Sequence, residues 1–228
     1  MRRIQNLMEQ WLFIGPDNRQ EQVNLPHTWN AKDGQDGGND YYRGTCHYEK
    51  TFEKPEFDPE TEEVYLEFLG VNASSDVTVN GKELAHHDGG YSTFRINITE
   101  VLEDQNKLEV TVDNSVNGKI YPQKADFTFY GGIYRDVRFL IVSKEHFDLD
   151  YLGSNGIKIT PEVKDSEANV HIETFTNTKD AQVCVQIKDQ DGKVVAEGDG
   201  CDVNLNIQNP IRWHGRKNPY LYTAAATL

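Results

Sequence analysis

Three polar side chains lie next to glycine-rich turns, where they could hydrogen-bond a ligand. Asp126 comes shortly before the pair Gly131–Gly132. Glycine has no Cβ, so this backbone can turn sharply or approach a ligand closely, and the Asp126 carboxylate can point into a cleft. Asn39 and Asp40 belong to a second glycine-rich loop, residues 34–42, whose side chains could reach a sugar hydroxyl. These residues predict hydrogen bonding to a polar ligand.

Each candidate also has a plainer interpretation. Asp126 could cap its own turn, as aspartate often does, and the two glycines could form a buried β-bulge ahead of a core strand. The loop 34–42 could be a flexible surface loop without a ligand. Four nearby aromatic residues could stack on a sugar ring or pack into a core instead: Tyr121, Phe127, Phe129 and Tyr130.

The other reactive residues predict no catalytic or metal site. Five acidic residues before Val64 are typical of a solvated turn: Glu56, Asp58, Glu60, Glu62 and Glu63. His86 and His87 would point to opposite faces of a strand and lack the spacing of zinc ligands. The three cysteines include no Cys-x-x-Cys pair, and either a Cys184–Cys201 disulfide or, by preference, free thiols fit the sequence. We expect no catalytic residue, metal or cofactor within this chain.

The charge of the chain excludes some partners. The 228 residues carry a formal net charge of −14, which repels phosphate groups and argues against nucleic acids and anionic membranes. The same charge weighs mildly against polyanionic glycans, including glucuronides. No apolar run approaches the ~18 residues of a membrane span. Polar residues interrupt the N-terminal segment where a signal peptide would be apolar, so we expect a cytoplasmic protein.

The apolar residues repeat mainly at every second position, which is typical of β-strands. One example is the series Leu108, Val110 and Val112. In another, Val64, Leu66 and Phe68 alternate with Tyr65, Glu67 and Leu69. Asn80-Gly81 predicts a tight hairpin turn. Only residues 98–102 suggest a helical turn. Many short strands between Gly, Asn and Asp turns predict an all-β sandwich.

The pattern restarts after Val142, which predicts a second domain. A polar stretch, residues 143–146, is followed by a new series of alternating segments. Val183, Val185 and Ile187 form one of them, and Val203, Leu205 and Ile207 form another. Their spacing is immunoglobulin-like. We therefore expect one domain over residues 1–144 and another over residues 145–228.

Seven segments occur in the same order as in one known family. In chain order they are Val23–Asn30, Tyr42–Phe52, Phe68–Asn72, Val79–Gly81, His87–Phe94, Asn106–Asn114 and Asp126–Arg138. Together they resemble the N-terminal region of glycoside hydrolase family 2, and most closely its β-galactosidases. Pro210–Trp213 and Asn218–Tyr222 resemble the end of the second domain of that family. His47 stands where the family commonly has Trp, so one packing contact is expected to differ.

The resemblance implies a jelly-roll, galactose-binding-like sandwich followed by an immunoglobulin-like sandwich that lacks its last strand here. It implies that Asp126 bonds a hydroxyl of the terminal sugar, a galactoside by preference. It also allows a monovalent or divalent cation in the full-length enzyme, and a homo-oligomer.

The same resemblance implies that catalysis is located elsewhere. Glycosidases need two carboxylates at the scissile bond. In this family both are glutamates of a (β/α)₈ barrel, one of them in an Asn-Glu pair, and this sequence contains no Asn-Glu. We therefore expect a non-catalytic front end that shapes the rim of the active site and buttresses a barrel. A free-standing carbohydrate-binding module and an adhesion-type sandwich are the alternatives.

Overall fold

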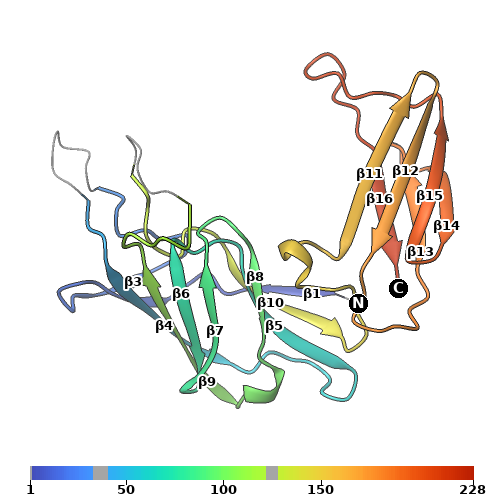
Figure 1. The fold of residues 1–228 in the computed structure, drawn as a ribbon. Coiled ribbons are helices and arrows are strands. Elements are labelled where there is room, and N and C mark those ends of the chain that lie inside the picture. Colours follow the sequence, from blue (N-terminus) through green and yellow to red (C-terminus); the bar gives the residue numbers. More distant parts are fainter. Residues whose placement is uncertain (1, 33–40, 122–127) are drawn as a thin grey trace. The chain divides into compact units, whose positions relative to one another are not determined.

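The computed structural model describes residues 2–32, 41–121 and 128–228. The chain divides into two compact units, Met1–Lys144 (unit 1) and Glu145–Leu228 (unit 2). Strands dominate both units (Figure 1), and the helical elements among the described residues are two 3-10 turns, η1 (Thr99–Val101) and η2 (Tyr151–Gly153). The predicted all-β class is confirmed. No helix in the described part of the chain is long and apolar enough to span a bilayer.

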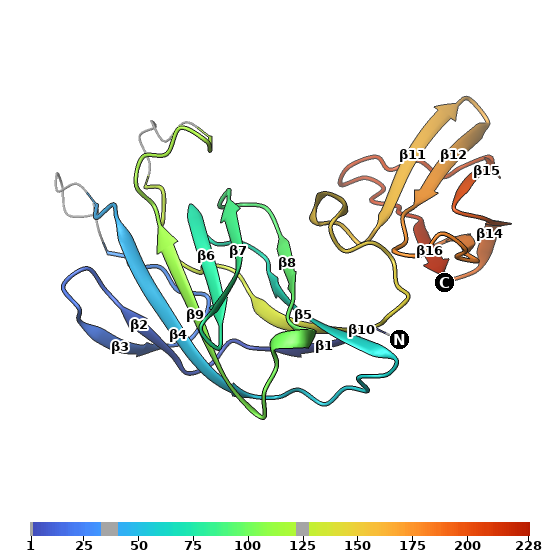
Figure 2. The same cartoon turned by 60° about the horizontal axis from the view of Figure 1, so that its bottom comes forward.

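Unit 1 is a sandwich of two antiparallel sheets (Figure 2). The larger sheet has the order β3-β2-β4-β9-β6-β7, and the smaller has the order β1-β10-β5-β8. The strands of the larger sheet are β2 (Trp11–Ile14), β3 (Gln20–Val23), β4 (Thr45–Glu53), β6 (Ser74–Val79), β7 (Lys82–Asp88) and β9 (Gln105–Asp113). Those of the smaller sheet are β1 (Arg3–Asn6), β5 (Glu62–Phe68), β8 (Phe94–Asn97) and β10 (Val137–Ser143).

The core of unit 1 follows the alternation seen in the sequence. Leu108, Val110 and Val112 of β9 are fully buried, while the residues between them are partly exposed. Large side chains fill the space between the sheets, among them Trp11, Tyr48, Phe68 and Phe139. Because successive strand residues point to opposite faces, a strand such as β9 contributes one apolar row to this core.

The local turn predictions are also confirmed. Asn80 (φ 51°) and Gly81 (φ 76°) connect β6 to β7, and positive φ at both positions is what a tight type I′ hairpin turn requires. The single helical turn expected at residues 98–102 is η1. His86 and His87 do point to opposite faces: His86 contacts Asp76 and Asp88, while the His87 ring stacks on Phe94.

Glu67 breaks the alternation, because this polar residue of β5 is completely buried. Arg95 Nε donates to its Oε1 at 2.7 Å, and Arg138 Nε contacts Oε2. Arg2 lies 3.6 Å from Oε1. A buried carboxylate is tolerated only when it is paired, and the three guanidinium groups supply that pairing.

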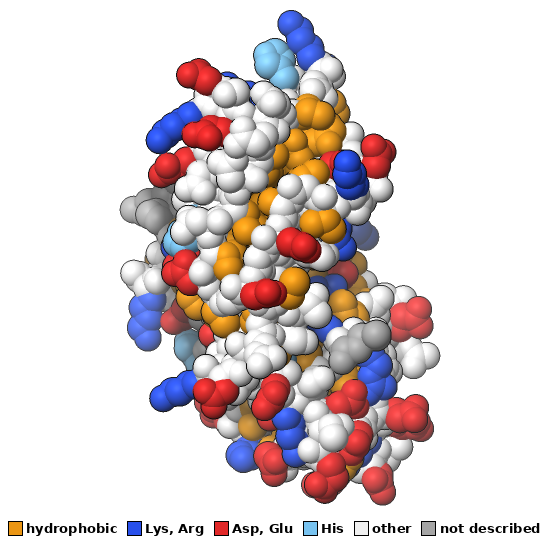
Figure 3. All heavy atoms as spheres, turned by 90° about the vertical axis from the view of Figure 1, so that its right-hand side faces the viewer, with side chains coloured by type: hydrophobic (Ala, Val, Ile, Leu, Met, Phe, Trp, Pro, Cys, Tyr) orange, Lys and Arg blue, Asp and Glu red, His pale blue; other side chains and the backbone are white. Residues whose placement is uncertain are grey.

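Unit 2 is built from two three-stranded antiparallel sheets, with the orders β11-β12-β15 and β14-β13-β16. The strands are β11 (Ile157–Lys164), β12 (Glu167–Thr174), β13 (Cys184–Lys188), β14 (Val194–Asp199), β15 (Asp202–Gln208) and β16 (Thr223–Thr227). Its core includes Ile172, Val185 and Leu205, in the alternating pattern that the sequence predicted. Acidic, basic and apolar side chains are interspersed on the face drawn in Figure 3.

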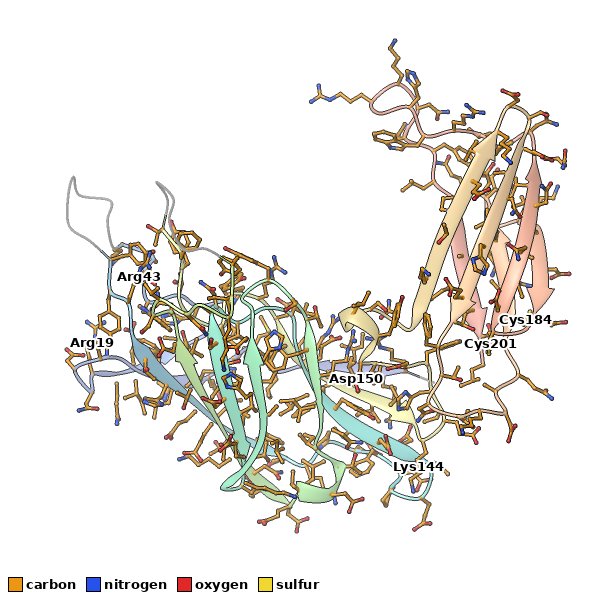
Figure 4. All side chains as sticks on the ribbon, viewed as in Figure 1. Arg19, Arg43, Lys144, Asp150, Cys184 and Cys201 are labelled. Carbon is orange, nitrogen blue, oxygen red and sulfur yellow. The ribbon has the colours of Figure 1, made fainter. Side chains whose placement is uncertain are left out.

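All three cysteines are free thiols, as preferred from the sequence. Cys46 is buried in unit 1, whereas Cys184 and Cys201 are only half-buried in unit 2 (Figure 4). Burial raises the pKa of Cys46 to about 12, so this thiol stays protonated at neutral pH.

Candidate functional site

The glycine pair at 131–132 packs against other parts of unit 1. A Cβ on Gly131 would lie 2.1 Å from Cζ2 of Trp29. Gly132 has φ +131°, and a Cβ there would lie 2.5 Å from the His27 carbonyl oxygen. Both positions therefore need glycine. The sequence predicted that the backbone at these glycines approaches another group closely, and it does. The described groups that it approaches, the Trp29 ring and the His27 carbonyl, belong to the protein itself.

Asn30 holds this turn in place. The side chain is completely buried, and its Oδ1 accepts hydrogen bonds from the Gly131 backbone N–H at 2.8 Å and from Asn114 Nδ2 at 3.2 Å. Its Nδ2 donates to the Tyr42 carbonyl at 3.0 Å. One amide thus links the glycine turn to the start of the segment leading into β4. Since a buried polar group must be hydrogen-bonded, this side chain fixes the local geometry.

Asn114, directly after β9, connects described residues near the two predicted binding segments, the loop 34–42 and the segment around Asp126. Its Nδ2 lies 3.4 Å from the Tyr42 carbonyl and 3.4 Å from the Phe129 carbonyl. Its Oδ1 accepts from the Gly44 N–H at 2.9 Å. Tyr42 comes two residues after Asp40, and Phe129 comes three residues after Asp126. The fold therefore joins the described neighbours of both loops through a single side chain.

Asn72 is the third buried amide of this network. Its backbone forms an isolated antiparallel bridge with Gly132, with N···O distances of 3.0 and 3.1 Å. Its Nδ2 donates to the Tyr130 carbonyl at 2.7 Å, and its Oδ1 accepts from the Tyr121 hydroxyl. Burial raises the pKa of Tyr121, which keeps this phenol protonated as a donor. Tyr121 and Tyr130, on either side of residues 122–127, are therefore both bound to Asn72.

His27 and Tyr48 form a hydrogen bond beneath the turn. Tyr48 Oη lies 2.8 Å from His27 Nδ1. Burial raises the pKa of Tyr48 and lowers that of His27, so this hydrogen bond joins a protonated phenol to a neutral imidazole at pH 7. This pair supports the loop backbone at His27 and Thr28 that Gly132 approaches.

The aromatic residues near the turn have different environments. Phe129 is buried, and its ring stacks on Tyr121 at a centroid distance of 5.9 Å. Tyr130 is 43% exposed and is not part of the core. Arg43, labelled in Figure 4, lies 4.7 Å above the ring of Tyr41 and 5.8 Å from the ring of Phe129. Phe127 lies outside the described residues.

The three predicted binding residues, Asp126, Asn39 and Asp40, also lie outside the described residues, and their roles stay predictions. Sequence reasoning assigned no role to the three buried asparagines. The signal was present, because three of the seven family-like segments end on them: Val23–Asn30, Phe68–Asn72 and Asn106–Asn114. Among the residues that the structure describes, no three His, Cys, Asp or Glu side chains gather as metal ligands.

Comparison with known proteins places both units in one family. The family description "Glycosyl hydrolase 2 galactose-binding domain-like" matches residues 38–148, and "Glycosyl hydrolases family 2" matches residues 154–228. A β-glucuronidase of Bacteroides fragilis is 34% identical over 90% of this chain and 32% of its own length. A β-galactosidase of Thermoanaerobacter pseudethanolicus is 29% identical over the whole chain and 33% of its own length.

The fold comparison agrees with the sequence comparison. The crystal structure of an FMN-binding β-glucuronidase from Faecalibacterium prausnitzii L2-6 superposes with a TM-score of 0.91 and 39% identity, over 99% of this chain and 36% of that protein. The chain thus spans about a third of the length of its relatives. It belongs to glycoside hydrolase family 2, and it comprises the galactose-binding-like domain and the following β-sandwich domain of that family.

Proposed function

We propose that this chain is the non-catalytic N-terminal part of a β-glycosidase and that unit 1 forms part of its active-site rim. The observation that carries the proposal is the amide network of Asn30, Asn72 and Asn114. It secures the described residues next to both predicted binding loops at one end of the sandwich. Binding loops held by a rigid scaffold are a common way to position a ligand.

The catalytic carboxylates are assigned to a barrel outside this sequence. The described strands build two sandwiches, and two of the acidic side chains cited above have structural partners. Glu67, for example, is enclosed by arginines, and Asp58 caps a turn by accepting from the Glu60 N–H and the Thr61 hydroxyl. We therefore propose that the chain alone does not hydrolyse glycosides.

The proposed substrate is a β-linked glycoside. The sequence prediction favoured a galactoside, partly because the chain is acidic. Net charge is a weak criterion, since charges more than about 10 Å apart are largely screened at 0.1 M salt. The two relatives of higher identity cited above are both β-glucuronidases. We therefore place β-glucuronides first and β-galactosides second.

Two measurements test this function. Purified chain should show no turnover of nitrophenyl β-glucuronide or β-galactoside, and turnover lost on mutating one of its own acidic residues would contradict the proposal. In the enzyme that joins this chain to a barrel, Asp126→Ala should lower kcat/KM. Loss of a charged acceptor costs about 1.5–3 kcal/mol, which corresponds to roughly 10–150-fold.

The matched control is Asp189→Ala. Asp189 caps a turn of unit 2 by accepting from the backbone N–H groups of Asp191 and Lys193. Its replacement should leave kcat/KM unchanged. An Asp126→Ala enzyme with full kcat/KM would reduce Asp126 to a turn cap. Tight sugar binding by the isolated chain would instead favour the free-standing carbohydrate-binding module.

A further inference from the structure

The loop 89–93 connects β7 of the larger sheet to β8 of the smaller sheet. Its Tyr91 ring packs on the Tyr121 ring at a centroid distance of 5.0 Å, and Tyr121 is the last described residue before Asp126. The Tyr91 ring also meets the ring of Tyr134 edge-on at 6.2 Å, and Tyr134 follows Asp126 in the sequence. The loop therefore contacts described residues on both sides of the predicted binding residue.

Hydrogen bonds and close packing fix the backbone of this loop. The Tyr134 hydroxyl donates to the Gly90 carbonyl, and Arg135 Nη1 donates to the Tyr91 carbonyl at 3.1 Å. Gly90 also lies directly against Asn72, since a Cβ on Gly90 would lie 2.3 Å from Asn72 Oδ1. The loop cannot move without breaking these contacts, so it holds the Tyr91 ring in one position.

We propose that Tyr91 is a positioning residue for the sugar site of unit 1, an inference that rests on the proposed function. The Tyr91 ring supports the Tyr121 ring, and the Tyr121 hydroxyl donates to Asn72 Oδ1. Asn72 Nδ2 donates in turn to the Tyr130 carbonyl at 2.7 Å. Tyr91 thus acts through Tyr121 and Asn72 on the backbone on either side of Asp126, and it needs no contact with the sugar.

Packing for stability alone is the alternative role of Tyr91. The side chain is 52% exposed, so only part of the ring is buried against Tyr121 and Tyr134. Loss of a ring that is half exposed leaves the core of unit 1 intact, and a variant without it should still fold. The two roles therefore differ in their effect on substrate use.

The first test is a double-mutant cycle in the purified chain, measured by urea unfolding. Tyr91→Ala and Tyr121→Leu each remove one ring of the pair. Their effects on the unfolding equilibrium constant should be coupled by roughly 2–12-fold, the usual range for an aromatic pair. Tyr91→Phe keeps the ring and should unfold like the wild type. Additive effects of the two single substitutions would overturn the inferred support of Tyr121 by Tyr91.

The second test measures hydrolysis of nitrophenyl β-glucuronide by the enzyme that joins this chain to a barrel. Tyr91→Ala should lower kcat/KM by about tenfold or more, because a small displacement of a binding group is enough for such a loss. Tyr91→Phe should keep the wild-type value. In the Asp126→Ala background, Tyr91→Ala should cause little further loss, because the group that it positions is already absent.

The control is Tyr220→Ala, which removes a ring from the tyrosine pair of unit 2, Tyr220 and Tyr222, at a centroid distance of 5.1 Å. Its effect on kcat/KM should be the same with and without Asp126. A Tyr91→Ala enzyme with full kcat/KM, or losses from Tyr91→Ala and Asp126→Ala that simply multiply, would overturn the inference while the proposed function stands. An Asp126→Ala enzyme with full kcat/KM would instead contradict the proposed function, and the role of Tyr91 with it.

Discussion

The side chain of Asn30 accepts a hydrogen bond from the backbone N–H of Gly131, which lies 101 residues further along the chain. The N···O distance is 2.8 Å, and the bond is buried. The Gly131–Gly132 turn, which leads into strand β10, is thereby fixed by Asn30, a residue that comes before the predicted binding loop 34–42. The two loops are separate in sequence, but they share this support.

Replacing Asn30 should destabilise unit 1. Asn30→Ala leaves the Gly131 N–H buried without its acceptor, and such a loss costs about 1–3 kcal/mol. Urea unfolding followed by Trp11 and Trp29 fluorescence, in a Trp213→Phe background, measures the change. Asn204→Ala, on the exposed face of β15, is the control and should change stability by less than about 0.5 kcal/mol. Equal stability of the two variants would contradict the role of Asn30.

Gly131 should not tolerate a methyl group. Gly131→Ala places a Cβ 2.1 Å from the Trp29 ring, so Trp29 or the turn must move. Overpacking of this kind costs about 1–3 kcal/mol. The same unfolding assay with Gly118→Ala gives the matched comparison, because no atom lies within 4 Å of that Cβ. If both alanines were equally harmless, the packing of the turn on Trp29 would be disproved.

Glu67 should be important for folding even though it has no proposed chemical role. Glu67→Gln removes the buried carboxylate that pairs with Arg2, Arg95 and Arg138. Breaking a buried ion pair of this kind costs about 3 kcal/mol or more of folding stability. The control is Glu109→Gln, because Glu109 pairs with Lys107 at the surface and such pairs contribute less than about 1 kcal/mol. A chemical denaturation midpoint that is the same for both variants would rule out this buried cluster as a stabilising element.

His27 should make unit 1 less stable in mild acid. Burial lowers its pKa below 6.5, so the unfolded chain binds a proton near pH 6.5 while the folded chain does not. This contribution is complete above pH 6.5 and is lost as the pH falls toward the folded pKa. His27→Gln should therefore lose less stability than the wild type between neutral and mildly acidic pH.

His86 provides the opposite control. Hydrogen bonds to Asp76 and Asp88 raise its pKa, so its contribution is complete below pH 6.5 and is lost as the pH rises through the folded pKa. His86→Gln should lose more stability on acidification than the wild type. Thermal unfolding at several pH values separates the two variants. Parallel curves for both would contradict the assignment.

Most strands could be predicted because their signal is local. The alternation of apolar and polar residues predicted β9, and the pair Asn80-Gly81 predicted the turn between β6 and β7. Strand β1 could not be found in this way, because Arg3–Asn6 is fully exposed and is held by backbone pairing with β10. The burial of Glu67 was equally hidden, since two of its three arginine partners, Arg95 and Arg138, lie 28 and 71 residues away.

The candidate site could be predicted only in part. Glycines 131 and 132 indicated a close backbone approach, but Trp29, the group approached, lies about a hundred residues earlier in the sequence. The buried asparagines could be noticed only as the shared last residues of three family-like segments, because a polar residue at the end of an apolar segment is usually a turn residue. Only the paired strands bring Asn30 and Asn114 together, and the sequence alone does not contain that register.

The link from Asn114 to both Tyr42 and Phe129 has an evolutionary consequence. Residues 33–40 and 122–127 are followed by backbone that one amide side chain fixes in position. Insertions, deletions and substitutions within these two segments can therefore accumulate without shifting the register of β4 or β10. Under the proposed function, exchanging these short segments would change the sugar that is recognised while the sandwich is inherited intact.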